Sequence, residues 1–171
     1  MLRLGLWATV GTLVVGVPPV APAVAGHDAV VVNEFAAGRY VELRNVSMST
    51  VDIGGFKLYL CDRYGVTGEV RIALDARLSG GDFYLVAAPA FTGDAADQVY
   101  SGVLPRGGAA LHDPDLGWVD GTAVVAGSPC GEGDPAPDCR SGSVARDADS
   151  VDTGRNAADF TCRPLSPRAP N

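Results

Sequence analysis

Residues 40–44 read Tyr40-Val-Glu-Leu-Arg44, and their apolar and polar side chains alternate. Val41 and Leu43 fall on one face of an extended chain and Glu42 and Arg44 on the other, because successive side chains of a strand point to opposite faces. This pattern predicts a β-strand with one face in a hydrophobic core and the other in water.

The same period of two continues on both sides of that stretch. Residues 30–35 are predicted to form an apolar strand, and residues 109–120 a hairpin with its turn at Asp113-Pro-Asp-Leu-Gly117. Glycine-containing segments such as residues 52–55 and 79–82 supply further turns, and no stretch keeps a helical period of 3.6 for ten residues. The pattern predicts an all-β, antiparallel β-sandwich. Its other core-facing positions are predicted to be Phe56, Leu58 and Leu60, then Val70, Ile72 and Leu74, then Phe83, Leu85 and Ala87.

The composition of the 171 residues agrees with this fold class. The chain has 22 glycines and 12 prolines, which are too many for a helical bundle. Hydrophobic residues make up 47% and charged residues 19%, so the chain can fill a core. The formal net charge of −7 argues against nucleic acids and anionic membranes as partners, because both repel an acidic surface.

The first 25 residues are predicted to be a secretory signal peptide. Arg3 gives a positive start, residues 4–17 form an apolar run, and Ala23-Val-Ala25 matches a small-residue cleavage site. At about 1.5 Å per residue in a helix, the run spans about 21 Å, short of a bilayer core of about 30 Å. We therefore expect a secreted product with a mature domain of residues 26–171, which is not an integral membrane protein after cleavage.

Four cysteines in an exported chain predict two disulfides. None stands in a C-x-x-C pair, so zinc-ribbon and thioredoxin-like sites lack their spacing. Of the three possible connectivities, the turn-rich loop between Cys130 and Cys139 favours a bridge between these two. Cys61–Cys162 is then the second predicted bridge.

Several motifs follow one another in a recognisable order. The first three are Asn33-Glu-Phe35, Tyr40-Val-Glu-Leu-Arg-Asn45, and Val51-Asp-Ile-Gly-Gly-Phe56 with Leu58. The later ones are Leu78-Ser-Gly-Gly-Asp-Phe-Tyr-Leu-Val86, the hairpin at residues 110–120, and Ser143-Val-Ala-Arg146 with Asp152-Thr153, Asn156 and Asp159-Phe160. Together they resemble the lamin tail domain family over residues 28–171. The end of the chain departs from the family pattern, because Ser166-Pro-Arg168 replaces a T-P-G.

The resemblance implies an immunoglobulin-like β-sandwich. It also implies a non-catalytic module of the kind found in exported bacterial proteins. It leaves the role unspecific, and the partner that we expect is an extracellular protein or a glycan of unknown identity.

Catalytic chemistry has little support in the sequence. His27 and His112 are the two histidines, and His112, beside Asp113, is the candidate for a general base on a strand. The chain contains neither a G-x-S-x-G elbow nor a G-x-x-x-x-G-K loop. We expect no enzyme and no cofactor, and a small exported hydrolase is the weakest alternative.

Asp147, Asp149 and Asp152 are the candidates for a calcium site, since hard cations bind clustered oxygen ligands. The EF-hand pattern is not met at its fifth, sixth and twelfth positions. The competing interpretation is a solvated acidic turn, in which the side chains of Arg146, Asp152 and Thr153 bond backbone groups. A calcium-dependent extracellular surface module is thus the alternative function.

A binding face would need outward aromatic side chains. The candidates are Tyr40, Tyr59, Tyr64, Tyr84 and Trp118. Tyr40 and Tyr59 lie opposite the aliphatic residues of their strands, which predicts either exposure or pairing across strands. The function predicted from the sequence is a secreted, non-catalytic structural or binding module.

Overall fold

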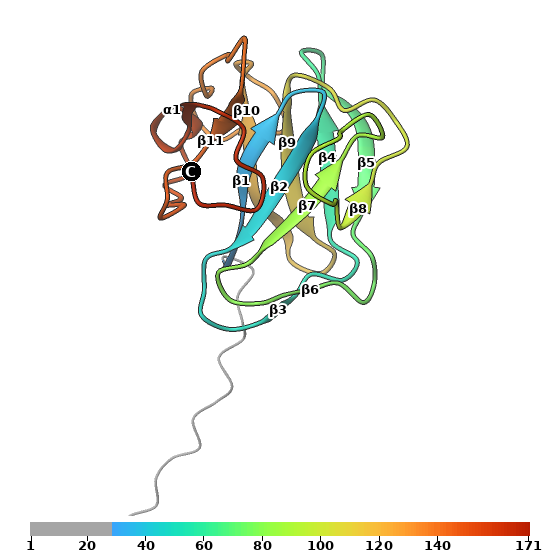
Figure 1. The fold of residues 1–171 in the computed structure, drawn as a ribbon. Helices are drawn as coiled ribbons and strands as arrows, with labels where there is room; N and C mark the ends of the chain where they lie inside the picture. The colour runs from blue at the N-terminus through green and yellow to red at the C-terminus, as the bar shows by residue number, and fades with distance from the viewer. Residues whose placement is uncertain (1–28) are drawn as a thin grey trace, which may run out of the picture.

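Strands make up most of the regular structure in the computed structural model, which describes residues 29–171 (Figure 1). The predicted signal peptide and His27 lie outside the described residues. Six strands form one sheet in the order β12-β11-β1-β2-β7-β8, four form a second in the order β10-β9-β4-β5, and β3 pairs with β6. All pairs are antiparallel except β7 with β8. The elements are β1 (Val30–Ala36), β2 (Tyr40–Asn45), β3 (Val51–Asp52), β4 (Lys57–Cys61), β5 (Val66–Arg71), β6 (Arg77–Leu78), β7 (Phe83–Ala87), β8 (Gln98–Val99), β9 (Gly108–Asp113), β10 (Gly117–Ala123), β11 (Ser143–Ala145), α1 (Asn156–Asp159) and β12 (Thr161–Arg163).

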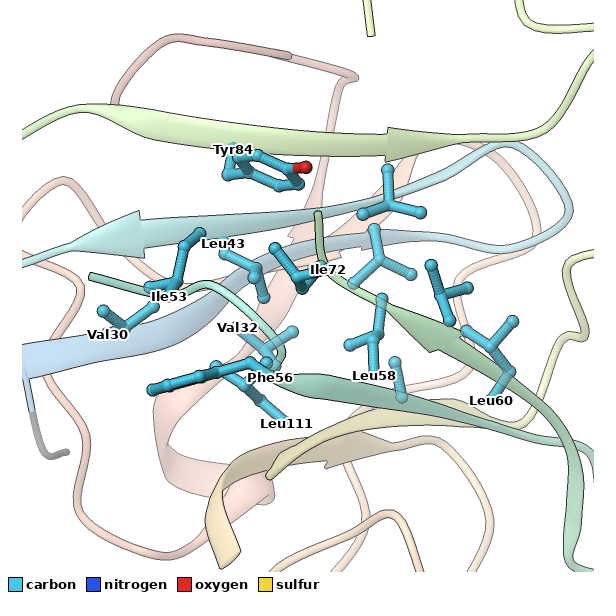
Figure 2. Close-up of a cluster of buried hydrophobic side chains, with 14 of the residues drawn as sticks. Val30, Val32, Leu43, Ile53, Phe56, Leu58, Leu60, Ile72, Tyr84 and Leu111 are labelled. Atoms are coloured by element: carbon cyan, nitrogen blue, oxygen red, sulfur yellow. The ribbon is translucent and has the colours of Figure 1, made fainter. Parts of the chain in front are cut away.

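The main hydrophobic core lies between the two large sheets, which confirms the predicted all-β sandwich. Val32 and Leu43 enter it from the six-stranded sheet, and Leu58 and Leu111 enter it from the four-stranded sheet (Figure 2). All four side chains are buried. The alternation in β2 and β4 therefore identified core positions correctly.

The predicted core positions are wrong in two places, in β7 and at Leu74. In β7, Tyr84 and Val86 face the main core, whereas Leu85 and Ala87 belong to a separate cluster on the other side of the sheet. Both sides of β7 are buried, so alternation could not tell which side faces the main core. Leu74 is 78% exposed, because β5 ends at Arg71 and the chain turns before reaching it.

The hairpin of β9 and β10 is confirmed. The carboxylate of Asp113 accepts hydrogen bonds from the backbone N–H groups of Asp115 and Leu116, which closes the turn. Gly117 has a φ of 88°, a left-handed conformation that glycine adopts without a steric penalty.

The outer face of the six-stranded sheet is covered by the chain itself. The last eight residues, 164–171, lie against this face and are here named the tail segment. Leu165 of the tail segment packs against a cluster of Ala36, Tyr40, Leu85 and Ala87. The prediction that Glu42 faces water is therefore wrong, since this face is the floor beneath the tail segment and Glu42 is fully buried.

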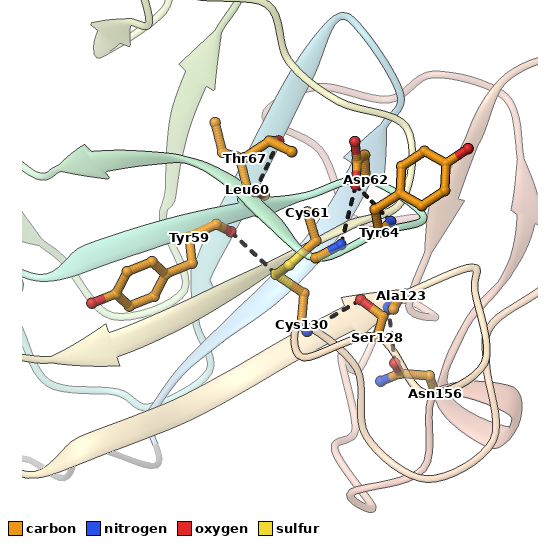
Figure 3. Close-up of a disulfide and its surroundings, with 11 residues drawn as sticks. Tyr59, Leu60, Cys61, Asp62, Tyr64, Thr67, Ala123, Ser128, Cys130 and Asn156 are labelled. Atoms are coloured by element: carbon orange, nitrogen blue, oxygen red, sulfur yellow. Dashed lines mark hydrogen bonds between the residues drawn. A yellow bond between two sulfur atoms is a disulfide. The ribbon is translucent and has the colours of Figure 1, made fainter.

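The disulfides join Cys61 to Cys130 and Cys139 to Cys162, so both predicted bridges are wrong. Cys61 ends β4 on the outer side of the four-stranded sheet, and the loop after β10 folds back so that Cys130 reaches it (Figure 3). Cys162 lies on β12, at the edge of the other sheet, where Cys139 meets it. Spacing along the chain reports the size of a loop and says nothing about the sheets on which its ends lie.

The two bridges together fix the loop between β10 and β11 to both sheets. Cys61–Cys130 spans 69 residues of sequence, and Cys139–Cys162 spans 23. All four cysteines are paired. Two disulfides in a domain of this size indicate an oxidising compartment, either extracellular or periplasmic.

Candidate functional site

The most densely charged buried region surrounds Arg146, which directly follows β11 and is 0% exposed. Its guanidinium forms ion pairs with Asp120 at 2.7 Å, with Asp159 at 3.1 Å and with Asp152 at 3.3 Å. The guanidinium carbon also lies 4.4 Å from the centre of the Phe160 ring. We name Arg146 and these three aspartates the Arg146 centre.

Two β-bulges explain why the Arg146 centre forms here. The register of β1 shifts between Val32 and Glu34, and that of β10 shifts between Trp118 and Asp120. Asp120 Oδ2 accepts the N–H of Val32 at 2.7 Å, and Arg146 Nε donates to the carbonyl of Val32 at 3.1 Å. The charged pair thus satisfies backbone groups at a bulge and joins the two sheets.

Burial raises the pKa of Asp120 to about 7, and the neighbouring carboxylates of Asp152 and Glu132 add to the rise, while Arg146 opposes it. Burial also raises the pKa of Glu132, whose Oε1 accepts the indole N–H of Trp118 at 2.8 Å. For Asp159, hydrogen bonds from Thr153 outweigh burial and hold the pKa below its usual range. A perturbed acid in a cleft is a candidate for catalysis. Here both oxygens of Asp120 already accept protein donors, so the centre is a structural junction.

The calcium candidates are not brought together. The oxygens of Asp120, Glu132 and Asp152 approach one another within 4.8 Å, and within the described part of the chain no comparable group of three includes Asp147 or Asp149. Asp152 Oδ1 accepts from Arg146 and from the N–H of Gly154, while Asp147 Oδ1 accepts the N–H of Asp149. These contacts match the competing interpretation of an acidic turn. The calcium site stays a prediction without geometric support.

Three aromatic rings form a row across the outer face of the four-stranded sheet. Tyr59 on β4 contacts His112 on β9 with ring centres 4.8 Å apart, and His112 contacts Trp118 on β10 at 5.3 Å. Both contacts are edge-to-face, a favourable geometry for aromatic pairs. All three side chains are half-buried, so part of each ring system remains accessible. We name these three residues the aromatic row.

The aromatic row contains two of the five aromatic candidates from the sequence. Tyr40 and Tyr84 are buried, and Tyr64 is 88% exposed in the turn between β4 and β5. His112, the candidate general base of the sequence, lies between the rings of Tyr59 and Trp118. Tyr59 is opposite Ala110 in the sheet, so His112, two residues further along β9, is its diagonal neighbour. Large side chains at diagonal positions of paired strands lie within reach of each other.

The surroundings of His112 do not resemble those of a general base. Burial, and then the charge of Lys57, lower the pKa of His112 below its usual range. Asp113 does not orient the imidazole, because its Oδ1 is used by the N–H groups of its own turn. The contacts of His112 with Tyr59 and Trp118 assign it to a packed aromatic surface.

An open cleft of about 1040 Å³ lies at one end of the sandwich, and no motif in the sequence predicts it. Its lining combines apolar groups such as Tyr100 and Val103 with charged ones of both signs, including Arg63, Arg106 and Asp138. No group of catalytic or metal-binding side chains converges on it among residues 29–171. The cleft therefore defines no chemistry of its own.

Comparison with known proteins adds no relative to this picture: no family model matches the chain, and no curated protein sequence matches it. The resemblance to lamin tail domains thus stays a prediction. Between residues 29 and 171, no helix is long and apolar enough to cross a membrane.

Proposed function

We propose that the chain is an exported, non-catalytic domain of the lamin tail type, which binds an extracellular partner through the aromatic row. The observation that carries this proposal is the contact of Tyr59, His112 and Trp118 across three adjacent strands. Aromatic side chains present a large rigid apolar area together with a polar edge, which suits recognition surfaces.

The polar groups around the aromatic row favour a glycan over a protein as the partner. Lys57 lies opposite His112 in the sheet, and Lys57 also pairs with Glu69 on β5 at 3.6 Å. A sugar offers an apolar ring face to the aromatic rings and hydroxyl groups to such flanking charges. The buried acids of the Arg146 centre are already occupied by protein donors, which supports a binding role over a catalytic one.

The test is retention of the purified protein on insoluble cell-wall polysaccharide. We expect Tyr59→Ala to reduce the retained fraction about tenfold, as for a central aromatic contact residue. Tyr59→Phe keeps the ring and should bind like the unchanged protein. Tyr64→Ala is the matched control, because it removes an exposed tyrosine outside the aromatic row.

Melting temperatures of all three variants show whether each one is folded. Equal losses for Tyr59→Ala and Tyr64→Ala would contradict the assignment of the aromatic row. Failure of the unchanged protein to bind any of the polysaccharides would contradict the choice of a glycan.

A further inference from the structure

The tail segment occupies a groove on the outer face of the six-stranded sheet. The floor of the groove carries Glu34 on β1 and Glu42 on β2, which are directly opposite each other in the sheet. Both glutamates are 0% exposed. Two buried carboxylates side by side require donors, since burying an unpaired charge is strongly unfavourable.

The donors come from the tail segment. Glu34 accepts the backbone N–H and the hydroxyl of Ser166, each at 3.3 Å. Glu42 accepts the backbone N–H of Arg168 at 2.5 Å, and Asn33 donates to its other oxygen at 2.9 Å. The N–H of Ala169 bonds the carbonyl of Ser166 at 3.1 Å, so residues 166–169 form a turn, and the floor binds the backbone N–H groups of Ser166 and Arg168 within it.

The side chains of the tail segment supply two further anchors. Leu165 fills the apolar part of the groove beside Tyr40 and Leu85. The guanidinium of Arg168 donates to the carbonyl of Ala95 at 2.8 and 3.1 Å, and it pairs with Asp97 at 2.6 Å. The groove thus contacts an apolar side chain, two backbone N–H groups and an arginine of the same segment.

The groove carries more acidic side chains than its occupant carries cations. Asp97 pairs with Arg168, the single cation of the tail segment, while Glu34 accepts from Ser166 and Glu42, whose pKa burial raises to about 7, accepts the backbone N–H of Arg168. A neighbouring cavity of about 430 Å³ is lined by Arg168 and Asp97 together with Asp82 and Arg77. The pairing with Asp97 favours an arginine-bearing peptide.

The tail segment contains no strand, so it can leave this face without breaking the pairing of the sheet. It follows β12, and the Cys139–Cys162 bridge fixes the chain just before it starts. Arg168 adopts a left-handed backbone conformation with φ of 61°, which costs a residue other than glycine about 1 kcal/mol. Opening therefore relieves strain and leaves the strand order unchanged.

We propose that the groove under the tail segment is a binding site for an arginine-bearing peptide of a partner protein that turns as residues 166–169 do, and that the tail segment closes it in the free domain. The tail segment acts as the intramolecular ligand of this site. A partner peptide makes the same contacts with Glu34, Glu42 and Asp97 after the tail segment leaves. The site lies on the sheet opposite the aromatic row, so the two surfaces are independent.

The experiment uses the full chain and a fluorescent peptide of residues 163–171, Arg-Pro-Leu-Ser-Pro-Arg-Ala-Pro-Asn, measured by fluorescence polarisation. The variant Arg168→Ala in the chain removes the arginine anchor of the tail segment. We expect it to bind the peptide at least tenfold more tightly than the unchanged chain does. Replacing the second arginine of the peptide by alanine, or adding Asp97→Ala to the chain, should each remove that gain.

Amide hydrogen exchange at Leu165 and Ser166 shows whether the tail segment opens in the Arg168→Ala chain. Exchange that stays as slow as in the unchanged chain would overturn the proposed closure by Arg168. Fast exchange without peptide binding would overturn the peptide site. Dimers of the Arg168→Ala chain in sedimentation, undisturbed by the peptide, would show that a second copy takes the place of the partner. None of these results depends on binding by the aromatic row.

Discussion

Two regions of this domain bury acidic side chains, and they differ in where their arginine comes from. In the Arg146 centre the arginine follows a strand, and its own N–H bonds the carbonyl of Asn33 at 3.0 Å. In the groove under the tail segment the arginine is Arg168, beyond the last strand, with a side chain 34% exposed. The guanidinium of Arg146 has no exposed surface and stacks on Phe160.

Because of this difference, the Arg146 centre stabilises the fold, whereas the groove under the tail segment can open while the fold stays intact. Removing Arg146 from its place means breaking the junction between the two sheets, because both Asp120 and Arg146 bond Val32. Removing Arg168 means lifting one short segment from an outer face. The first region therefore belongs to the fold, and the second is suited to exchange one ligand for another.

The comparison is tested most strongly by making the same substitution in both regions. Arg146→Met should lower the free energy of unfolding by about 3–5 kcal/mol, because it leaves buried carboxylates without their cation. Arg168→Met should lower it by about 1 kcal/mol or less, since the pair with Asp97 is partly solvated. Urea denaturation measures both values, and losses of equal size would show that the two regions do not differ in this way.

A second test uses pH. Burial raises the pKa of Glu42 from an ordinary 4.5 to about 7, so the folded domain binds a proton that the unfolded chain releases. The stability from this group is complete below pH 4.5 and is lost as the pH rises through about 7. We expect the free energy of unfolding to fall by about 2–3 kcal/mol on its account between pH 5 and pH 8.

The variant Glu42→Gln should remove this part of the pH dependence, because its side chain does not ionise. At pH 5 it should cost about 1 kcal/mol, since the amide replaces one of two acceptor oxygens, and at pH 8 it should no longer be less stable than the unchanged chain. Glu69→Gln is the matched control on an exposed strand and should leave the pH profile unchanged. A Glu42→Gln profile as steep as that of the unchanged chain would contradict the assignment. If Glu42→Gln removes only part of the pH dependence, we expect the rest to come from Asp120, whose pKa burial also raises to about 7.

The contrast between the two regions also explains what the sequence could predict. Alternation located the main core in β2 and β4, because Val41 and Leu58 have neighbours of the other polarity. It failed at Leu85 and Glu42 because a segment more than 70 residues away covers them, and a local pattern contains no information about such a cover. The disulfide pairing failed for the same reason.

The candidate site shows the same limit. The prediction that the side chains of Arg146 and Asp152 bond backbone groups is confirmed by their bonds to the carbonyl of Val151 and the N–H of Gly154. The hydroxyl of Thr153 instead bonds the carboxylate of Asp159. Asp120 was missed, since its role depends on bulges that place it beside Val32, 88 residues away in the chain. Of the aromatic row, Tyr59 and Trp118 were candidates on strand pattern alone. The contact of His112 with both required the register of β4, β9 and β10.

The finest test of the comparison concerns the backbone of Arg168. Its φ of 61° is left-handed, at the position where the resemblance to lamin tail domains has glycine. Arg168→Ala and Arg168→Gly both remove the bonds to Ala95 and Asp97, but only glycine relieves the backbone. We expect the tail segment to be about 1 kcal/mol more stable with glycine than with alanine, measured from the amide exchange of Leu165 and Ser166. Equal exchange rates in the two variants would show that the conformation of Arg168 stores no strain, and that its side chain alone decides how firmly the groove is closed.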